Sequence, residues 1–105
     1  MSMIYISHPY GNQPENKQKV EEIIRELVLS HPEHTYISPI HCFGFMYHDF
    51  DYETGLEMCL NLLEKCDKML VFGDWKSSIG CTAEVLFAEN HMIPYEIVKN
   101  RSCIS

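Results

Sequence analysis

The chain has 105 residues, a length that suits one domain and leaves little room for a second. Its composition, 46% hydrophobic and 22% charged, is typical of a globular protein that buries one modest core. The formal net charge of −7 argues against a nucleic-acid backbone or an anionic membrane as the main partner, because both recruit clustered Lys and Arg. A small phosphorylated ligand remains compatible with this charge, since backbone N–H groups at a helix start can hold a phosphate.

The sequence opens without a basic and apolar leader, and no apolar run is long enough to span a bilayer. The cysteines are odd in number and irregular in spacing: Cys42, Cys59, Cys66, Cys81 and Cys103. We therefore expect a cytoplasmic protein whose cysteines are reduced thiols.

The first third of the chain predicts a strand, a helix and a second strand. Residues 3–7 are apolar, aromatic and β-branched, which is typical of a strand, and the Pro and Gly that follow indicate a turn. Asn12 is expected to cap a helix that runs to Ser30. The apolar stripe of this helix consists of Val20, Ile23, Ile24, Leu27 and Val28. Residues 35–39 then predict a short strand.

The same alternation continues after one long aromatic segment. Residues 40–55 show no periodicity and are expected to form a loop over a pocket. Helices are predicted over 55–67 and 81–91, and strands over 68–72 and 94–98. The residues expected to point inward from the two helices are Leu56, Leu60 and Leu63, then Ala83, Leu86 and Phe87.

This order predicts an α/β fold: one small doubly wound domain over residues 1–105, Rossmann-like or flavodoxin-like, with about four parallel strands and helices on both faces. In such folds a ligand binds at the carboxyl ends of the strands, where the strand order reverses. The loops "SHPYGN" (7–12) and "GDWKSSIG" (73–80) are expected to meet there.

Glu84 stands among small and apolar residues near the start of the last predicted helix. It can be an acidic first-turn residue that stabilises the helix dipole by a few tenths of a kcal/mol up to ~1 kcal/mol. Alternatively, it is a carboxylate held ionised at the mouth of the sheet and available as a nucleophile.

Three stretches resemble the nucleoside 2-deoxyribosyltransferase superfamily, which includes N-glycosidases acting on nucleoside 5′-monophosphates: "IYISHPYGN" (4–12), "CDKMLVFG" (66–73) and "SSIGCTAEVLFA" (77–88). The resemblance extends over residues 4–97. Its strongest part is the pattern Ser/Asp-x-Gly-x-x-x-Glu, here Ser78, Gly80 and Glu84. The chain also resembles small phage and bacterial proteins of unknown function placed near this superfamily.

The resemblance implies a mechanism in which Glu84 attacks the anomeric carbon of a ribose or deoxyribose and the base leaves. Water or a second base then resolves the glycosyl-enzyme ester, as in retaining glycoside hydrolysis. No metal or organic cofactor is needed. Family members that take free nucleosides tend to carry Asp where this chain has Ser78, whereas those that take 5′-monophosphates carry Ser. Ser78 therefore implies a phosphate contact, with Ser77 as the neighbouring candidate; a plain helix N-cap is the alternative for Ser78.

In the family, the first loop lines the sugar and phosphate site, so the resemblance assigns substrate contacts to His8, Tyr10, Gly11 and Asn12. Tyr5 or Tyr10 is expected to assist catalysis. The alternative is a Pro-Gly turn whose Asn caps a helix. His41 follows the second strand and is expected either to contact the base or shuttle a proton, since His titrates near neutral pH, or to be a structural histidine.

One departure from the family concerns the proton source. The family usually carries an Asp in the helix before the third strand, where it protonates the departing base, and the matching position here is near Cys59. Glu57 and Glu53 lie close by in the sequence and can substitute for this Asp from a shifted register, which makes Glu57 a candidate catalytic residue; Asp49 and Asp51 precede them in the loop. A missing general acid lowers the rate by a factor on the order of a hundred or more.

Other chemistries have weaker support. A zinc site drawn from His41, Cys42, His48 and Cys59 lacks ligand spacing, and Cys81 as a nucleophile rests only on its place near a helix start. No P-loop and no GxGxxG follows the first strand. Aromatic residues that can stack on a base, form a subunit interface or belong to the core are Phe43, Phe45, Tyr47, Phe50, Tyr52 and Trp75.

The expected partners are a small nucleotide or nucleoside and a second copy of the chain, because the family often completes its pocket from a neighbouring subunit. Two rivals to the enzyme remain. The same pocket can bind a nucleotide without cleaving it, as a sensor or sequestering module, or the domain can be an interaction module with a vestigial site.

Overall fold

The computed structural model describes residues 1–99, in which strands and helices alternate as predicted. The strands are β1 (Met3–Ser7), β2 (Thr35–Ile37), β3 (Lys68–Val71) and β4 (Tyr95–Ile97). The helices are α1 (Pro14–Ser30), α2 (Pro39–Phe43), α3 (Tyr52–Glu64) and α4 (Ile79–Asn90), with short 3-10 helices η1 (Gly44–Met46) and η2 (Trp75–Ser77).

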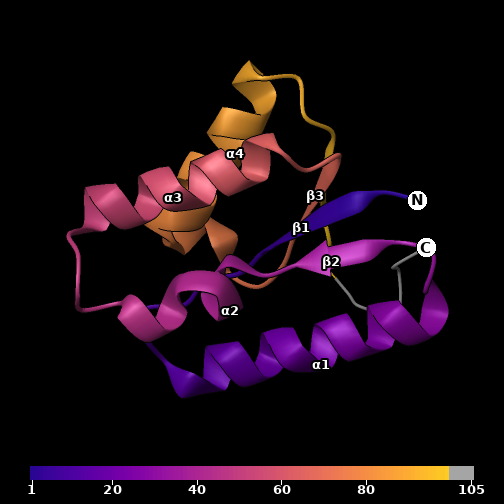
Figure 1. Cartoon of the computed structure of the whole chain (residues 1–105), viewed down its shortest axis with the longest axis horizontal. Coiled ribbons are helices and arrows are strands. Elements are labelled where there is room, and N and C mark those ends of the chain that lie inside the picture. The colour runs from indigo at the N-terminus through magenta and orange to yellow at the C-terminus, as the bar shows by residue number, and fades with distance from the viewer. Residues whose placement is uncertain (100–105) are drawn as a thin grey trace.

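The strands form one parallel sheet in the order β2-β1-β3-β4. Helix α1 packs on one face of this sheet, and α3 and α4 pack on the other (Figure 1). The prediction of a small doubly wound α/β fold is therefore confirmed. The chain leaves β1 in one direction and crosses back to β3, so the strand order reverses between these two strands. Their carboxyl ends mark the place where a ligand is expected.

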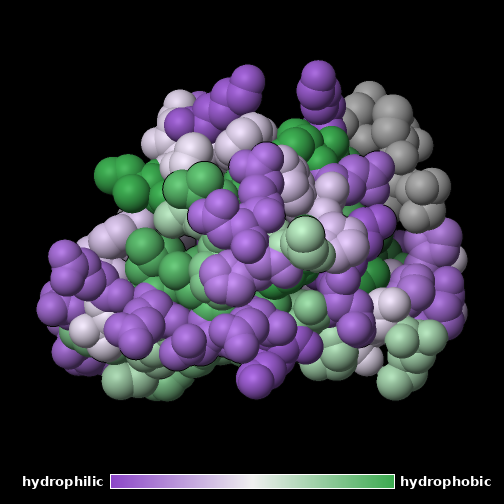
Figure 2. Space-filling model, turned by 90° about the horizontal axis from the view of Figure 1, so that it is seen from above, coloured by the Kyte–Doolittle hydropathy of each residue, from purple (hydrophilic) through white to green (hydrophobic). Residues whose placement is uncertain are grey.

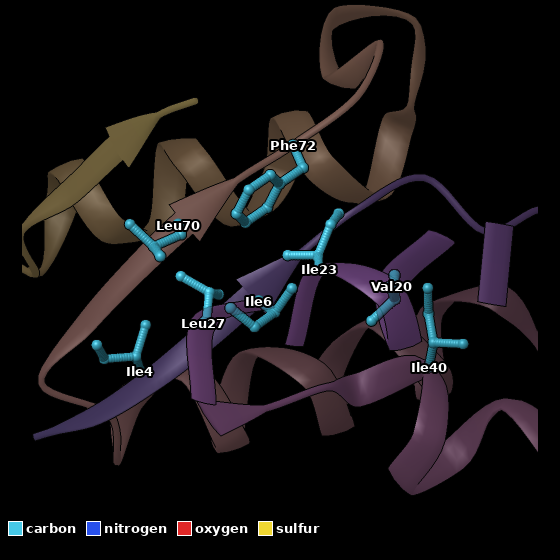
Figure 3. Packing of buried hydrophobic residues seen from close by; sticks show 8 residues of the cluster. All are labelled: Ile4, Ile6, Val20, Ile23, Leu27, Ile40, Leu70 and Phe72. Carbon is cyan, nitrogen blue, oxygen red and sulfur yellow. The ribbon is translucent and has the colours of Figure 1, made fainter. Parts of the chain in front are cut away.

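Each face of the sheet is covered by a hydrophobic cluster, because successive side chains of a strand point to opposite faces. The cluster beneath α1 contains Ile4, Ile6, Val20, Ile23, Leu27, Ile40, Leu70 and Phe72 (Figure 3). The cluster beneath α3 and α4 contains Tyr5, Leu63, Cys66, Met69, Val71, Val85 and Ala88.

The apolar stripes predicted for α1 and α4 differ in outcome. The stripe of α1 is confirmed except for Val28, which is 44% exposed. The prediction for α4 is wrong for Leu86, which is 59% exposed. The buried residues of α4 are Cys81, Glu84, Val85 and Ala88. Because α4 is apolar on nearly every side, its periodicity does not fix which face turns inward.

Residues 40–55 are largely helical, so the prediction of a long loop is wrong. Ser38 begins α2 by accepting a hydrogen bond from the His41 N–H at 3.3 Å, with Pro39 at the first helical position. Asp51 begins α3 in the same way, accepting from the Thr54 N–H at 2.8 Å. These two capping signals were hidden among aromatic residues.

Asn12 does not cap α1. Its φ of 57° places it in the left-handed region, and Gln13 occupies the N-cap position. The cysteines within the described residues, Cys42, Cys59, Cys66 and Cys81, are free thiols, as expected. Cys103 lies outside the described residues.

Across residues 1–99, none of the helices combines the length and the apolar character needed to cross a membrane.

Candidate functional site

Glu84 is the sixth residue of α4 and lies in the second turn of this helix. It faces the sheet and is only 6% exposed, whereas the first turn of α4 carries no acidic residue. The interpretation of Glu84 as a first-turn charge at the surface is therefore wrong. A buried carboxylate is strongly unfavourable unless it has hydrogen-bond donors, so the partners of Glu84 define the site.

Two hydroxyl groups of β1 donate to the Glu84 carboxylate. Tyr5 Oη donates to Oε2, and Ser7 Oγ donates to Oε1 at 2.8 Å. Tyr5 and Ser7 are two residues apart on one strand, so both point to the same face, and both are 0% exposed. Burial raises the pKa of Glu84 to about 7, while the hydrogen bonds from Tyr5 and Ser7 act in the opposite direction. The carboxyl group therefore changes its ionisation near neutral pH.

Glu84 forms part of the wall of a cavity of about 280 Å³. This volume is near the lower limit of small-molecule sites, which span roughly 300 to 1,000 Å³. The aromatic residues in the wall are Tyr10, Phe43, Tyr47, Phe50 and Tyr52. Aromatic faces of this kind suit a flat heterocycle. The prediction that residues 40–55 cover a pocket is thus confirmed, although the segment is helical.

The cavity lies at the carboxyl ends of β1 and β3, where the loop after β1 meets the start of α4. His8, directly after β1, lines it, and Nδ1 of His8 lies 2.7 Å from the carbonyl oxygen of Pro9. Because a carbonyl only accepts, Nδ1 carries the hydrogen and Nε2 of the neutral ring is an acceptor. Burial lowers the pKa of His8, which favours this neutral ring.

Ser78 and Gly80 also line the cavity, at the start of α4. Ser78 is the N-cap of the helix, and its Oγ accepts from the Cys81 N–H at 3.2 Å. A hydroxyl that accepts one hydrogen bond can still donate its own hydrogen, so the cap and a ligand contact are compatible. The charged residues of the lining are Asp51 and Glu84, and no Lys or Arg is among them.

The loop after β1 is joined to the segment between α2 and α3 by two contacts, which we call the clasp. The rings of Tyr10 and Tyr47 meet edge to face with centroids 5.5 Å apart. Asn12 Nδ2 lies 2.9 Å from His48 Nε2. Gly44 permits this approach, because a Cβ there would lie 3.2 Å from the Tyr10 ring. The clasp holds two walls of the cavity together.

Five residues expected at the site lie outside the cavity lining: Tyr5, Glu57, Ser77, Asn12 and His41. Of these, Tyr5 still belongs to the site through its hydrogen bond to Glu84. Glu57 is exposed because Leu56 and Cys59 of α3 face the cavity, whereas Glu57 lies on another side of this helix. Ser77 is exposed in η2, and Asn12 belongs to the clasp. His41 Nε2 lies 2.9 Å from Glu21 Oε2, so this histidine links α2 to α1 as in the structural alternative.

Cys59 lines the cavity at the position where the resemblance expects an acid. Burial, followed by the charge of Glu84, raises the pKa of the Cys59 thiol to about 11, so it is neutral. Asp51 lines the cavity too, but its hydrogen bond from Thr54 lowers its pKa and keeps it ionised. Glu53 is exposed and outside the lining. The cavity wall thus lacks an obvious proton donor for a departing base.

The geometry gives little support to a metal site or to a cysteine nucleophile. Within the described residues, no three His, Cys, Asp or Glu side chains group so that they could hold a metal ion. Cys81 is buried, and its burial raises the pKa of the thiol, which opposes a nucleophilic thiolate. Trp75 packs against the cluster beneath α3 and α4, whereas Phe45 is 82% exposed.

Ser7 is the contact of Glu84 that the sequence analysis missed. The alternation of side chains along a strand could have identified it, because Ser7 follows Tyr5 by two residues and must face the same side of the sheet. A buried serine at the end of β1 is then placed to bond whatever polar group α4 presents.

Comparisons with known proteins agree with this fold. No curated protein sequence matches the chain. A solved structure described as a 2-desoxiribosyltransferase from Leishmania mexicana is similar, with a TM-score of 0.67 and 15% sequence identity over 92% of this chain. The match covers 63% of that longer chain, and at this identity it shows the fold alone. Residues 2–98 match the family described as Domain of unknown function (DUF7768). The chain therefore belongs to the DUF7768 family.

Proposed function

We propose that the chain cleaves the bond between base and sugar in a nucleoside 5′-monophosphate, as an N-glycosidase or a deoxyribosyltransferase, with Glu84 as the nucleophile. The observation that carries this proposal is a buried carboxylate, held by two hydroxyls, in the wall of an aromatic cavity. A carboxyl group whose pKa is strongly raised inside a cavity is typical of a functional site. The fold shared with a 2-desoxiribosyltransferase supports the same chemistry.

In the proposed reaction, a Glu84 carboxylate oxygen bonds to the anomeric carbon as the carbon–nitrogen bond breaks. The electron pair of that bond leaves with the base, which takes up a proton. Water, or a second base, then attacks the same carbon and frees the carboxylate. Only the ionised carboxylate is a nucleophile, so the rate should rise with pH through about 7.

The cavity offers a contact for each part of such a substrate. The aromatic rings stack on the base, and His8, Tyr10 and Gly11 lie beside the sugar. Ser78 Oγ and the N–H groups at the start of α4 bind the phosphate. Because no Lys or Arg lines the cavity, the phosphate would rest on neutral donors. A comparison of each nucleoside with its 5′-monophosphate tests this assignment.

A second candidate function is favoured by Cys59. With a neutral thiol where the proton donor is expected, the pocket would bind a nucleotide without cleaving it. The two functions share the cavity and differ in chemistry alone, so one set of incubations separates them.

The experiment incubates the chain with every ribo- and deoxyribonucleoside and its 5′-monophosphate, with and without an acceptor base. Free base is measured by chromatography. The proposal expects release by the wild type and by Glu57→Gln, an exposed matched control, and none by Glu84→Gln. Absence of release from all compounds would reject the enzyme. Stabilisation by a nucleotide, about 2.7 kcal/mol at a hundredfold excess over Kd, would then support the binding module.

We further propose that the chain forms a homodimer. Helix α4 exposes Ile79 (74%) and Leu86 (59%), and Tyr52 at the cavity wall is 55% exposed. Figure 2 shows hydrophobic surface among polar side chains on the upper side of the molecule as drawn in Figure 1. A second copy placed over these residues would bury apolar surface and shield the cavity from water.

A further inference from the structure

Ser7 is a fully buried polar residue whose hydroxyl is directed at a carboxylate. Its backbone is fixed by the sheet, because Ser7 pairs with Val71 and its carbonyl oxygen accepts from the Phe72 N–H at 2.9 Å. Its Oγ donates to Glu84 Oε1, while Tyr5 occupies Oε2. The hydroxyl is therefore a donor whose position is set by a rigid strand.

We propose that Ser7 is a positioning residue for Glu84, whose hydroxyl fixes the orientation of the carboxylate and favours its ionised form. This inference rests on the proposed function and extends it to a residue that neither the motif nor the cavity wall contains.

The physical reason is the difference between one donor and two. A hydrogen bond to an ionised carboxylate stabilises that form relative to the protonated one. Without Ser7, Oε1 would be a buried oxygen with no partner, which is strongly unfavourable for a charge. The carboxyl group would then keep its proton to a higher pH. It would also lose the second anchor that fixes its rotation, leaving only the bond from Tyr5.

Several other titratable groups surround Glu84. The groups whose ionisation responds to its charge are Tyr5 on β1, Tyr52 and Cys59 on α3, and Cys81 on α4. Burial raises the pKa of each, so all remain neutral where Glu84 titrates. His8 also lines the cavity, and burial lowers its pKa. A fall in rate at acidic pH can therefore arise from Glu84 or from His8, so the ionisation of Glu84 must be followed directly.

The test uses three variants of Ser7 and one control. Ser7→Ala removes the donor, Ser7→Cys fills the space with a weak donor, and Ser7→Thr keeps the hydroxyl. The control, Ser38→Ala, removes another buried serine that caps α2 and is not part of the cavity wall. The carbon-13 resonance of the Glu84 carboxyl is titrated with pH and assigned by its absence in Glu84→Gln. The pH profile of kcat/KM for base release is measured alongside.

We expect the midpoint of the Glu84 titration to move to higher pH in Ser7→Ala and Ser7→Cys. On the acidic side, kcat/KM should fall about tenfold and recover at alkaline pH, which corresponds to one pKa unit. Ser7→Thr should restore both readouts, and Ser38→Ala should change neither. An unchanged midpoint in Ser7→Ala and Ser7→Cys would overturn the inference.

The two readouts keep this result separate from the proposed function. If the wild type releases no base, the proposed glycosidase activity is rejected. A midpoint of the Glu84 titration that still moves in Ser7→Ala then means that Ser7 controls the ionisation of Glu84 in a binding site, and the catalytic part of the inference is overturned. If the wild type is active and the midpoint stays fixed, only the role of Ser7 fails.

Discussion

Replacing Glu84 by Gln should stabilise the folded chain at alkaline pH and change its stability little below pH ~4.5. Burial raises the pKa of the folded-state carboxyl from 4.5 to about 7. A raised pKa means that the folded state binds the proton more tightly than the unfolded state. The associated stability is therefore fully present below pH 4.5 and is lost as pH rises through about 7. Gln has no titrating proton, so the variant does not lose this stability as the pH rises.

The size of the effect follows from the same two values. The interval from 4.5 to about 7 corresponds to roughly 3 kcal/mol, and the difference between the two proteins should level off above pH ~8. Domains of this kind have total stabilities of about 5 to 15 kcal/mol, so a change of this size is readily measured. Gln can still accept from Tyr5, and the Ser7 hydroxyl can rotate to accept from the amide.

The assay is urea unfolding at a series of pH values from 4 to 9 for the wild type, Glu84→Gln and the exposed control Glu57→Gln. Fluorescence of Trp75, which packs against the cluster beneath α3 and α4, reports the transition. Taking the difference between proteins cancels every titration that they share. A difference between the wild type and Glu84→Gln that does not vary with pH, or a variant less stable at pH 8, would refute this reasoning.

Ser78→Ala should lower kcat/KM for a 5′-monophosphate by about ten- to a hundredfold, because a hydrogen bond to the charged phosphate is lost. The controls are the matching nucleoside as substrate and the Ser77→Ala variant. Equal losses for both substrates would contradict a phosphate contact. Asn12→Ala removes the hydrogen bond to His48 in the clasp and the bond that Asn12 Oδ1 accepts from Tyr10 Oη at 3.2 Å, and it should raise KM about fivefold with little change in kcat, as steady-state kinetics would show. Leu86→Lys should shift the dimer toward monomer in sedimentation equilibrium, whereas Met92→Lys, at a position 91% exposed, should not; a dimer unaffected by the former would place the interface elsewhere.

The fold could be read from the sequence because its core positions repeat with the periods of strands and helices. The wholly apolar β3 and the stripe of α1 are the clearest cases. Residues 40–55 could not be read in this way, because the segment contains the five-residue α2, the three-residue η1 and only the start of α3, and none of these pieces is long enough to display a helical period. The capping signals at Ser38 and Asp51 were the remaining clue to α2 and α3.

The candidate site was predictable in part, for a similar reason. Ser78, Gly80 and Glu84 all line the cavity because they lie at the N-cap and within the first two turns of one helix, α4. Glu57 does not, because closeness in sequence does not fix the side of a helix that a residue occupies. Ser7 depends on the packing of β1 against α4, which a linear sequence does not display.

Cys59 is the position at which the enzyme and the binding module differ most. Asp at this position would lie in the cavity wall, where burial and the charge of Glu84 act on any acid as they act on the thiol. Neighbouring buried carboxyls cannot both ionise readily, so one keeps its proton near neutral pH and can donate it to the departing base.

Cys59→Asp should therefore accelerate base release by a factor on the order of a hundred, measured at saturating substrate near pH 6. Cys59→Asn is the matched control, since it has the same shape and no proton to give. Equal rates for the two variants would mean that protonation of the base does not limit the reaction, which contradicts the reasoning. If neither variant nor the wild type releases base, while a nucleotide still raises their melting temperatures, Glu84 holds a ligand and attacks nothing.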